Sequence, residues 1–100
     1  MVDIVNNTAG QQWEASLDGE LAGYSQYRTR PGRIVFTHTV VDPRFEGKGI
    51  GTALAKTAVE DAVANELRIT PLCPFVRAWL KRHPEFHASV DWPPEKPDSA

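Results

Sequence analysis

The chain has 100 residues, of which 41% are hydrophobic and 24% charged, and its formal net charge at pH 7 is −2. This is typical of one small globular domain, and the slightly acidic balance excludes a nucleic-acid-binding protein that relies on overall positive charge. No apolar run approaches the roughly 20 residues of a membrane span, the N-terminus has no signal-peptide core, and one cysteine excludes an internal disulfide, so we expect a cytoplasmic protein.

The first half of the chain predicts an antiparallel meander. Polar and apolar residues alternate in the first strand, and Asp18-Gly19 is the two-residue signal for a hairpin. The third strand is apolar or β-branched on both faces, so we expect it to be central in the sheet. The three predicted strands are residues 11–17, 20–29 and 33–41, and residues 2–6 are a weaker candidate for another strand.

The second half switches to helical spacing. A helix is predicted from Gly49 to about Asn65, followed by a short strand over residues 67–70. A second helix begins at Pro74 and stops at Pro84. The two buried helix faces are expected to carry Leu54, Ala55, Ala58, Val59, Ala62 and Val63 in the first helix and Phe75, Val76, Trp79 and Leu80 in the second.

These elements predict an α+β (mixed α/β) fold, with an antiparallel meander followed by a helix, a short strand and a second helix. We expect one compact domain over residues 1–90. Residues 91–100 are rich in proline and polar side chains, which predicts a disordered tail.

Residues 45–51, FEGKGIG, place three glycines between a strand and a helix. Free N–H groups and the helix dipole at such a point favour an anion, above all a phosphate, although a turn without a ligand is the simpler alternative. A Walker loop is excluded, because Asp42 replaces its first glycine and Gly49 follows Lys48. A Rossmann fingerprint is excluded, because Thr52 replaces its third glycine and a meander precedes the loop.

A third motif fits the loop. Residues 46–51 resemble the acyl-CoA pyrophosphate loop Q/R-x-x-G-x-G/A of the Gcn5-related N-acetyltransferases, with Glu46 in place of Gln or Arg. The chain is also similar to a miniature subfamily of these enzymes across roughly residues 12 to 90. The segments that carry this resemblance are FTHT at 36–39, FEGKGIG at 45–51, PLCPFV at 71–76 and HPEF at 83–86.

The resemblance implies a minimal N-acetyltransferase fold that binds acetyl-CoA. By position, it implies that main-chain groups of Thr39, Val40 and Val41 hold the pantetheine arm and polarise the acetyl carbonyl. Lys48 adds a cation, and Arg44 could reach a phosphate, although a solvated arginine is the commoner case. The residues implied to hold the pyrophosphate are Gly47, Lys48, Gly49, Ile50, Gly51 and Thr52.

His38 is the leading candidate for a general base, because imidazoles in general, with an unperturbed pKa of about 6.5, suit that chemistry. It lies in the strand that ends beside the implied thioester site. However, it alternates with Ile34, Phe36 and Val40, so a histidine packed in the core is the competing interpretation.

Cys73 is the second catalytic candidate. At a helix N-terminus the dipole favours thiolate, so Cys73 could carry the acetyl group in a ping-pong route or protonate the leaving CoA thiolate. The alternative is a small packed residue. Cys73 with His83 and His87 has a spacing that zinc sites use, but Pro84 interrupts the helix and a fourth ligand is missing, so we expect no metal.

The sequence therefore predicts an acetyl-CoA-dependent N-acetyltransferase that transfers the acetyl group to an unidentified amine by direct attack. The alternative is a non-catalytic acyl-CoA-binding module. The acceptor is a small-molecule or protein amine, no nucleic-acid or membrane partner is expected, and the chain is a monomer or a weak dimer.

Overall fold

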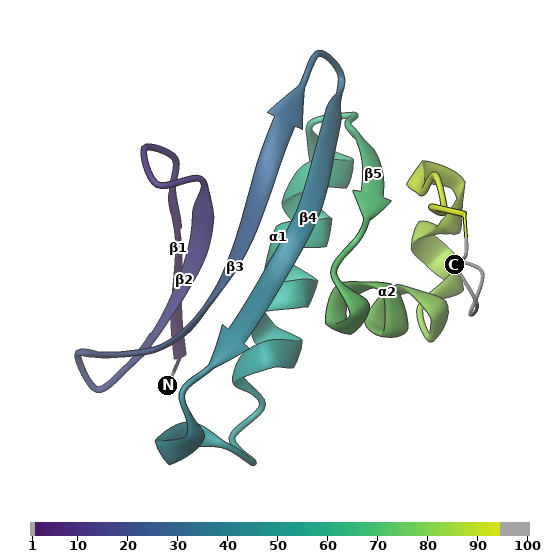
Figure 1. Cartoon of the computed structure of the whole chain (residues 1–100). Helices are drawn as coiled ribbons and strands as arrows, with labels where there is room; N and C mark the ends of the chain where they lie inside the picture. Colours follow the sequence, from purple (N-terminus) through teal and green to yellow (C-terminus); the bar gives the residue numbers. More distant parts are fainter. Residues whose placement is uncertain (1, 95–100) are drawn as a thin grey trace, which may run out of the picture.

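Five strands form one sheet in the computed structural model, which describes residues 2–94 (Figure 1). The sheet has the order β1-β2-β3-β4-β5, in which the first four strands are antiparallel and β5 is parallel to β4. The predicted meander, the extra N-terminal strand and the central position of the third predicted strand are confirmed. The strands are β1 Val2–Asn7, β2 Gln12–Leu17, β3 Glu20–Arg30, β4 Arg33–Val41 and β5 Arg68–Pro71.

The predicted hairpin between β2 and β3 is present. Asp18 and Gly19 both have positive φ, 51° and 82° respectively. Positive φ at both central residues defines the type I′ turn, whose twist matches that of the flanking strands.

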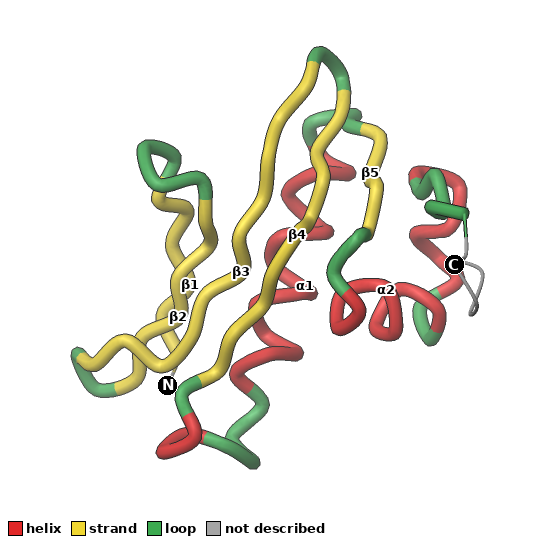
Figure 2. The backbone as a smooth tube through the Cα atoms, in the orientation of Figure 1, coloured by secondary structure: helices red, strands yellow, loops and turns green. Residues whose placement is uncertain are grey.

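Helix α1, Ile50–Ala64, lies across one face of the sheet and contacts all five strands (Figure 2). Its buried side chains recur at helical spacing, so one stripe of the helix covers the apolar face of the sheet. The predicted burial is confirmed except at Val63, which is only half-buried. The buried residues of α1 are Ile50, Gly51, Leu54, Ala55, Ala58, Val59 and Ala62.

The pairing between β4 and β5 is short. It extends only from Arg33 to Phe36 on β4, and the N–H of Cys73 then donates to the Phe36 carbonyl over 2.9 Å. The chain turns there into α2, Pro74–Lys81, with Cys73 as its N-cap and Pro74 as its first residue, as predicted. Among the described residues, the second half of β4 therefore has no strand partner on the β5 side.

Two short 3₁₀ helices were not predicted. The first, η1 (Pro43–Phe45), joins β4 to α1, and the second, η2 (Pro84–Ser89), follows α2. Each begins at a proline, whose fixed φ and missing N–H suit the first position of a helical turn.

A β-bulge changes the direction of the side chains in β4. Gln26 pairs with His38 and Tyr27 pairs with Phe36, so Thr37 is one residue too many for β3. Because side chains alternate along a strand, an extra residue moves every later side chain to the opposite face. His38 is therefore exposed instead of lying in line with Phe36. The expected apolar surroundings of His38 are wrong, and with them the interpretation of a core histidine.

The bulge also turns Thr39 toward the interior, where it joins a short polar chain. The hydroxyl groups of Ser25 and Thr39 lie 3.0 Å apart, and the Cys73 thiol donates to Thr39 Oγ1 over 3.3 Å. Ser25 and Cys73 are 0% and 2% exposed. Buried polar groups need partners, so the hydrogen bonds among Ser25, Thr39 and Cys73 fix how β3, β4 and the start of α2 meet.

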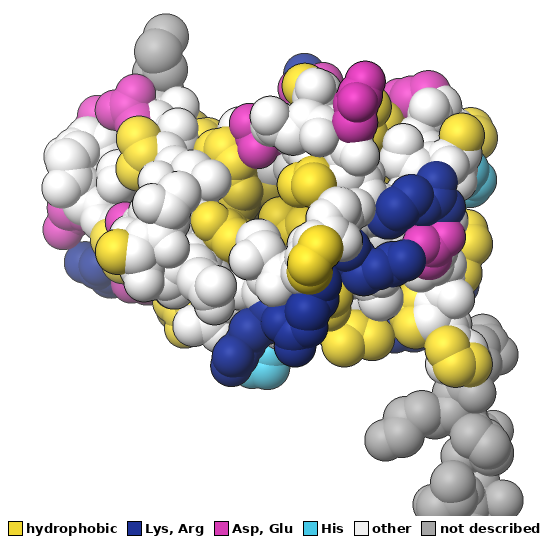
Figure 3. All heavy atoms as spheres, turned by 90° about the horizontal axis from the view of Figure 1, so that it is seen from above, with side chains coloured by type: hydrophobic (Ala, Val, Ile, Leu, Met, Phe, Trp, Pro, Cys, Tyr) yellow, Lys and Arg dark blue, Asp and Glu magenta, His cyan; other side chains and the backbone are white. Residues whose placement is uncertain are grey.

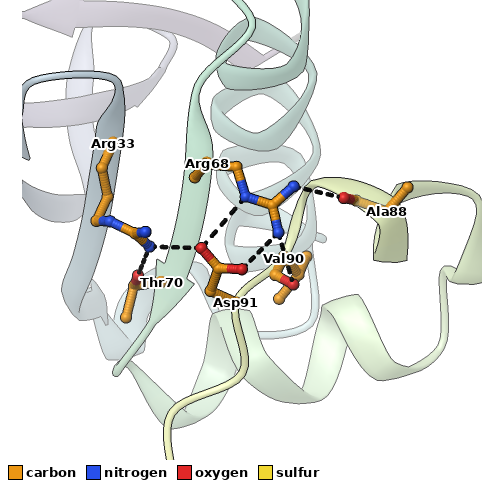
Figure 4. Close-up of polar contacts among 6 residues, drawn as sticks. All are labelled: Arg33, Arg68, Thr70, Ala88, Val90 and Asp91. Atoms are coloured by element: carbon orange, nitrogen blue, oxygen red, sulfur yellow. Dashed lines mark hydrogen bonds and ion pairs between the residues drawn. The ribbon is translucent and has the colours of Figure 1, made fainter.

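The segment after η2 covers the outer edge of β5. The N–H of Asp91 donates to the Ile69 carbonyl over 2.8 Å, and the Asp91 carboxylate pairs with Arg68 and Arg33 (Figure 4). Arg33 also donates to Thr70 Oγ1 over 2.7 Å. The hydrogen bonds from Arg68 and then Arg33 lower the pKa of Asp91 to about 2. Figure 3 shows basic side chains gathered over this end of the molecule, with an acidic side chain among them.

Most of the predicted tail lies outside the described residues, which end at residue 94. The predicted domain boundary at residue 90 stays a prediction. Within residues 2–94, no helix is long and apolar enough to cross a membrane.

Replacing Thr39 by Val removes the hydroxyl between Ser25 and Cys73. We expect the free energy of unfolding to fall by about 1–3 kcal/mol, because the buried Ser25 hydroxyl loses its partner. Urea denaturation measures this change. In the Ser25→Ala/Thr39→Val double variant both hydroxyls are absent, so its loss should be smaller than the sum of the single losses. An additive result would contradict the coupling.

Replacing Asp91 by Asn tests the ion pairs at β5. The pKa of Asp91 is lowered from 3.8 to about 2 in the folded protein. Its stabilising contribution is therefore present above pH 4 and is lost as the pH falls through about 2. Thermal unfolding of Asp91→Asn at low salt should depend less on pH across this window than that of the unmodified protein. Identical pH profiles would argue against a stabilising role for these pairs.

Candidate functional site

The loop before α1 presents a row of free N–H groups. Gly47 and Gly49 adopt φ values of 82° and 74°, which ordinary residues avoid. The first helical hydrogen bond runs from the Ala53 N–H to the Gly49 carbonyl over 3.0 Å. Within residues 2–94, no N–H group from residue 47 to residue 52 donates to a protein acceptor. These donors, together with the positive end of the α1 dipole, suit an anion.

A cleft of about 380 Å³, here called the loop cleft, opens beside this row. It contains six of the residues implied to hold the donor, together with three others. The six are Val41, Gly47, Gly49, Ile50, Gly51 and Thr52, and the others are Phe45, Glu46 and Phe75.

A second cleft, of about 320 Å³, lies where β4 and β5 separate. This cysteine cleft brings together both catalytic candidates with two residues implied to hold the pantetheine arm. Those four residues are His38, Thr39, Val40 and Cys73, and the cleft is completed by Thr37, Pro74 and Phe75. The chain thus places residues more than 30 positions apart around one cavity.

The free edge of β4 connects the two clefts. The Asp42 N–H donates to the Ala22 carbonyl in β3 over 2.8 Å. Because backbone groups alternate along a strand, those of Val40 also face β3, whereas those of Thr39 and Val41 face the open edge. Main-chain donors and acceptors of Thr39 and Val41 are therefore available there, and Val40 contributes its side chain.

The two expected cations lie outside both clefts. The Arg44 guanidinium donates to the Asp42 carboxylate over 3.1 Å and lies 3.6 Å from a Glu20 carboxylate oxygen. The hydrogen bonds between Arg44 and Asp42 lower the pKa of the Asp42 carboxyl group and raise the pKa of the Arg44 guanidinium. Arg44 is thus held locally, and the exposed Lys48 lines neither cleft.

Two residues of the site were not found from the sequence. Thr37 lines the cysteine cleft because of the bulge, which one strand alone does not reveal. Phe75 was assigned to the buried face of α2 by its spacing, yet it is 40% exposed and lines both clefts. The signal for Phe75 was its position in PLCPFV, two residues after Cys73.

The histidines of the disfavoured metal interpretation are bonded elsewhere. His83 Nδ1 lies 2.7 Å from the Trp79 carbonyl, and His87 Nε2 lies 2.7 Å from the Leu80 carbonyl. In the part of the chain that the structure describes, no group of three or more His, Cys, Asp or Glu could hold a metal ion.

Solved structures with a similar fold are acetyltransferases by description. A GCN5-like protein from Staphylococcus aureus, to which N-acetyltransferase activity is ascribed, aligns with a TM-score of 0.70 and 21% identity over 98% of this chain and 96% of that chain. A ribosomal-protein-alanine N-acetyltransferase from Brucella melitensis biovar Abortus 2308 aligns with a TM-score of 0.56 and 22% identity over 86% and 68% of the two chains. A protein from Desulfovibrio desulfuricans that is ascribed to the GNAT acetyltransferases aligns with a TM-score of 0.52 and 27% identity. The alignment covers 58% of this chain and 40% of that chain.

No protein with a curated description matches the chain. At 21% and 22% identity, the Staphylococcus and Brucella structures establish the fold. The sequence model of the GCN5-related N-acetyl-transferases matches residues 12–90, which is most of the chain. This protein therefore belongs to the GCN5-related N-acetyltransferase family, whose members are acetyltransferases.

Proposed function

We propose that the protein is an acetyl-CoA-dependent N-acetyltransferase in which an amine attacks the bound thioester directly. The observation that carries this proposal is the presence of backbone groups without a partner among the described residues, both at the open edge of β4 and in the first turn of α1. The open edge of β4 borders the cysteine cleft with Cys73 and His38, and the first turn of α1 borders the loop cleft.

The donor fits these groups by chemistry. The N–H groups of residues 48–52 are free to bind a pyrophosphate, and Thr39 and Val41 present main-chain groups of the kind that bind the amides of a pantetheine arm. Lys48 and Arg44 lie outside the clefts, and the charge of Arg44 is already balanced by Asp42 and Glu20, so in this proposal only Lys48 contributes long-range attraction to the phosphates. Glu46 lines the loop cleft but is exposed, so in this proposal its carboxylate turns to solvent when the phosphates bind.

Acetyl-CoA carries its acetyl group as a thioester. An uncharged amine readily attacks the carbonyl carbon of a thioester. The protein must place the amine, polarise the carbonyl and remove a proton. In this proposal, main-chain N–H groups at the open edge of β4 donate to the carbonyl oxygen as it gains negative charge. The proposal gives this role to Thr39 and Val41, which line the two clefts in turn.

His38 is the proposed general base. It is exposed, lines the cysteine cleft, and its Nδ1 lies 3.0 Å from the Thr37 carbonyl oxygen. When Nδ1 carries the proton and donates to this carbonyl, Nε2 is left unprotonated and can accept a proton from the amine. The bulge at Thr37 is thus what makes a base possible at this position.

Cys73 is proposed as a proton donor to the leaving thiolate. Its side chain lines the cleft, yet it is 2% exposed and already hydrogen-bonded to Thr39. A group held in this way suits a proton transfer better than a covalent acetyl carrier, which must leave its partner to attack. Direct transfer is therefore favoured over the ping-pong route.

Exchanging the loop glycine tests donor binding. Gly49 and Gly19 have similar positive φ values, 74° and 82°, and open space around the Cβ position. An alanine at either site carries about 1–2 kcal/mol of backbone strain. We expect Gly49→Ala to raise the Kd for acetyl-CoA by roughly tenfold in calorimetric titration. Gly19→Ala should cost similar stability with an unchanged Kd, and equal effects on binding would contradict the assignment of the loop.

Steady-state release of CoA with a panel of small amines and amino-terminal peptides tests catalysis. With an accepted amine, His38→Gln should lower kcat by roughly 100-fold and leave KM for acetyl-CoA nearly unchanged. His87→Gln, outside both clefts, is the matched control. Cys73→Ser should keep measurable turnover, and the mass of the unmodified protein should not change with acetyl-CoA alone.

Three results would redirect the proposal. An acetyl adduct that Cys73→Ala abolishes would establish the ping-pong route. Full activity of His38→Gln would show that His38 is not the general base. Tight binding of acetyl-CoA without release for any amine in the panel would favour the non-catalytic binding module.

A further inference from the structure

Phe75 is placed unlike its neighbours on α2. The other large apolar side chains of this helix, Val76, Trp79 and Leu80, are at most 2% exposed, whereas Phe75 is 40% exposed. Its spacing alone would put it on the buried face. A single exposed aromatic residue is common on protein surfaces, so exposure by itself carries no function.

Phe75 is shared by the two clefts. It lines the cysteine cleft together with His38 and Cys73, and it lines the loop cleft together with Gly51 and Thr52. A molecule that extends from the thioester end to the loop therefore has to pass this ring.

The ring is positioned by the first turn of α1. A Cβ atom on Gly51 would lie 2.7 Å from Cζ of Phe75, and 3.1 and 3.2 Å from Cε1 and Cε2. These three atoms form the far edge of the ring, so that edge rests directly on the Gly51 backbone. Gly51 is not among the glycines with positive φ. Glycine is therefore needed at position 51 to make room for Phe75. At positions 47 and 49, by contrast, glycine is needed because φ is positive there.

We propose that Phe75 binds the pantetheine arm of CoA, holding its apolar methyl and methylene groups against the open edge of β4. This inference rests on the proposed acetyl-CoA site and adds a binding residue to it. Pantetheine is long and flexible, so a rigid aromatic surface halfway along it fixes the thioester in place. The ring offers apolar contact only, so it recognises pantetheine and makes no contribution to phosphate or adenine binding.

Binding of two ligands to Phe75→Ala separates these roles. The ligands are CoA and adenosine 3′,5′-bisphosphate, which lacks the pantetheine arm. Calorimetry or, for weak binding, amide chemical shifts give the two Kd values. We expect Phe75→Ala to raise the Kd for CoA by on the order of tenfold and to leave that for the bisphosphate within twofold. Phe75→Leu should fall between the unmodified protein and Phe75→Ala.

Unchanged CoA affinity in a folded Phe75→Ala variant would overturn the inference and leave the proposed function standing. An equal loss for both ligands would also overturn it, because the ring would then only support the loop. Failure of the unmodified protein to bind CoA at all would overturn the proposed function and this inference together.

A double-mutant cycle with Gly51 gives a second, independent test. Gly51→Ala must displace the ring, so we expect it to weaken CoA binding severalfold on its own and to have no further effect in the Phe75→Ala background. Additive losses would place the effect of Gly51 at the phosphates and contradict the inference. Thermal unfolding of each variant checks that the fold is retained.

Discussion

The site depends on the point at which β4 and β5 part. The N–H of Cys73 donates to the carbonyl of Phe36, the last residue of β4 that pairs with β5. Helix α2 begins immediately afterwards. Among the described residues, the backbone groups of Thr39 and Val41 that face away from β3 have no protein partner, and such groups need a ligand or solvent to bind. In the proposed function, the donor binds along this edge much as an extra strand would.

The bulge at Thr37 and this separation work together. Without the extra residue, His38 would point toward α1 and Thr39 would point away from Cys73. With it, the histidine is exposed at the cleft while Ser25, Thr39 and Cys73 form a buried polar chain. One residue thus determines both which side chain can meet an acceptor and how α2 is anchored. Bulges are frequent next to active sites for this reason.

Much of the fold could be predicted because its signals are local. Asp18-Gly19 specifies its own turn, Pro74 marks its own helix start, and α1 repeats its apolar residues at a regular spacing. The glycine loop was found because its residues are adjacent in sequence.

The parts that were missed depend on distant residues. The face of His38 is decided by register against β3, and the exposure of Phe75 is decided by the first turn of α1, which lies on another element. Asp91 falls in a segment whose composition suggests disorder, yet two arginines from β4 and β5 hold it against the sheet. None of these contacts leaves a periodic trace in the sequence.

In the proposed function, the open edge of β4 and the first turn of α1 form one continuous donor site. A titration of the isotope-labelled protein with CoA, followed by amide chemical shifts, tests this continuity. If the site is continuous, the same dissociation constant is obtained from the amides of Thr39, Val41 and residues 48–52, while the β1–β2 hairpin is unaffected. Shifts confined to other surfaces, or none up to millimolar CoA, would contradict it.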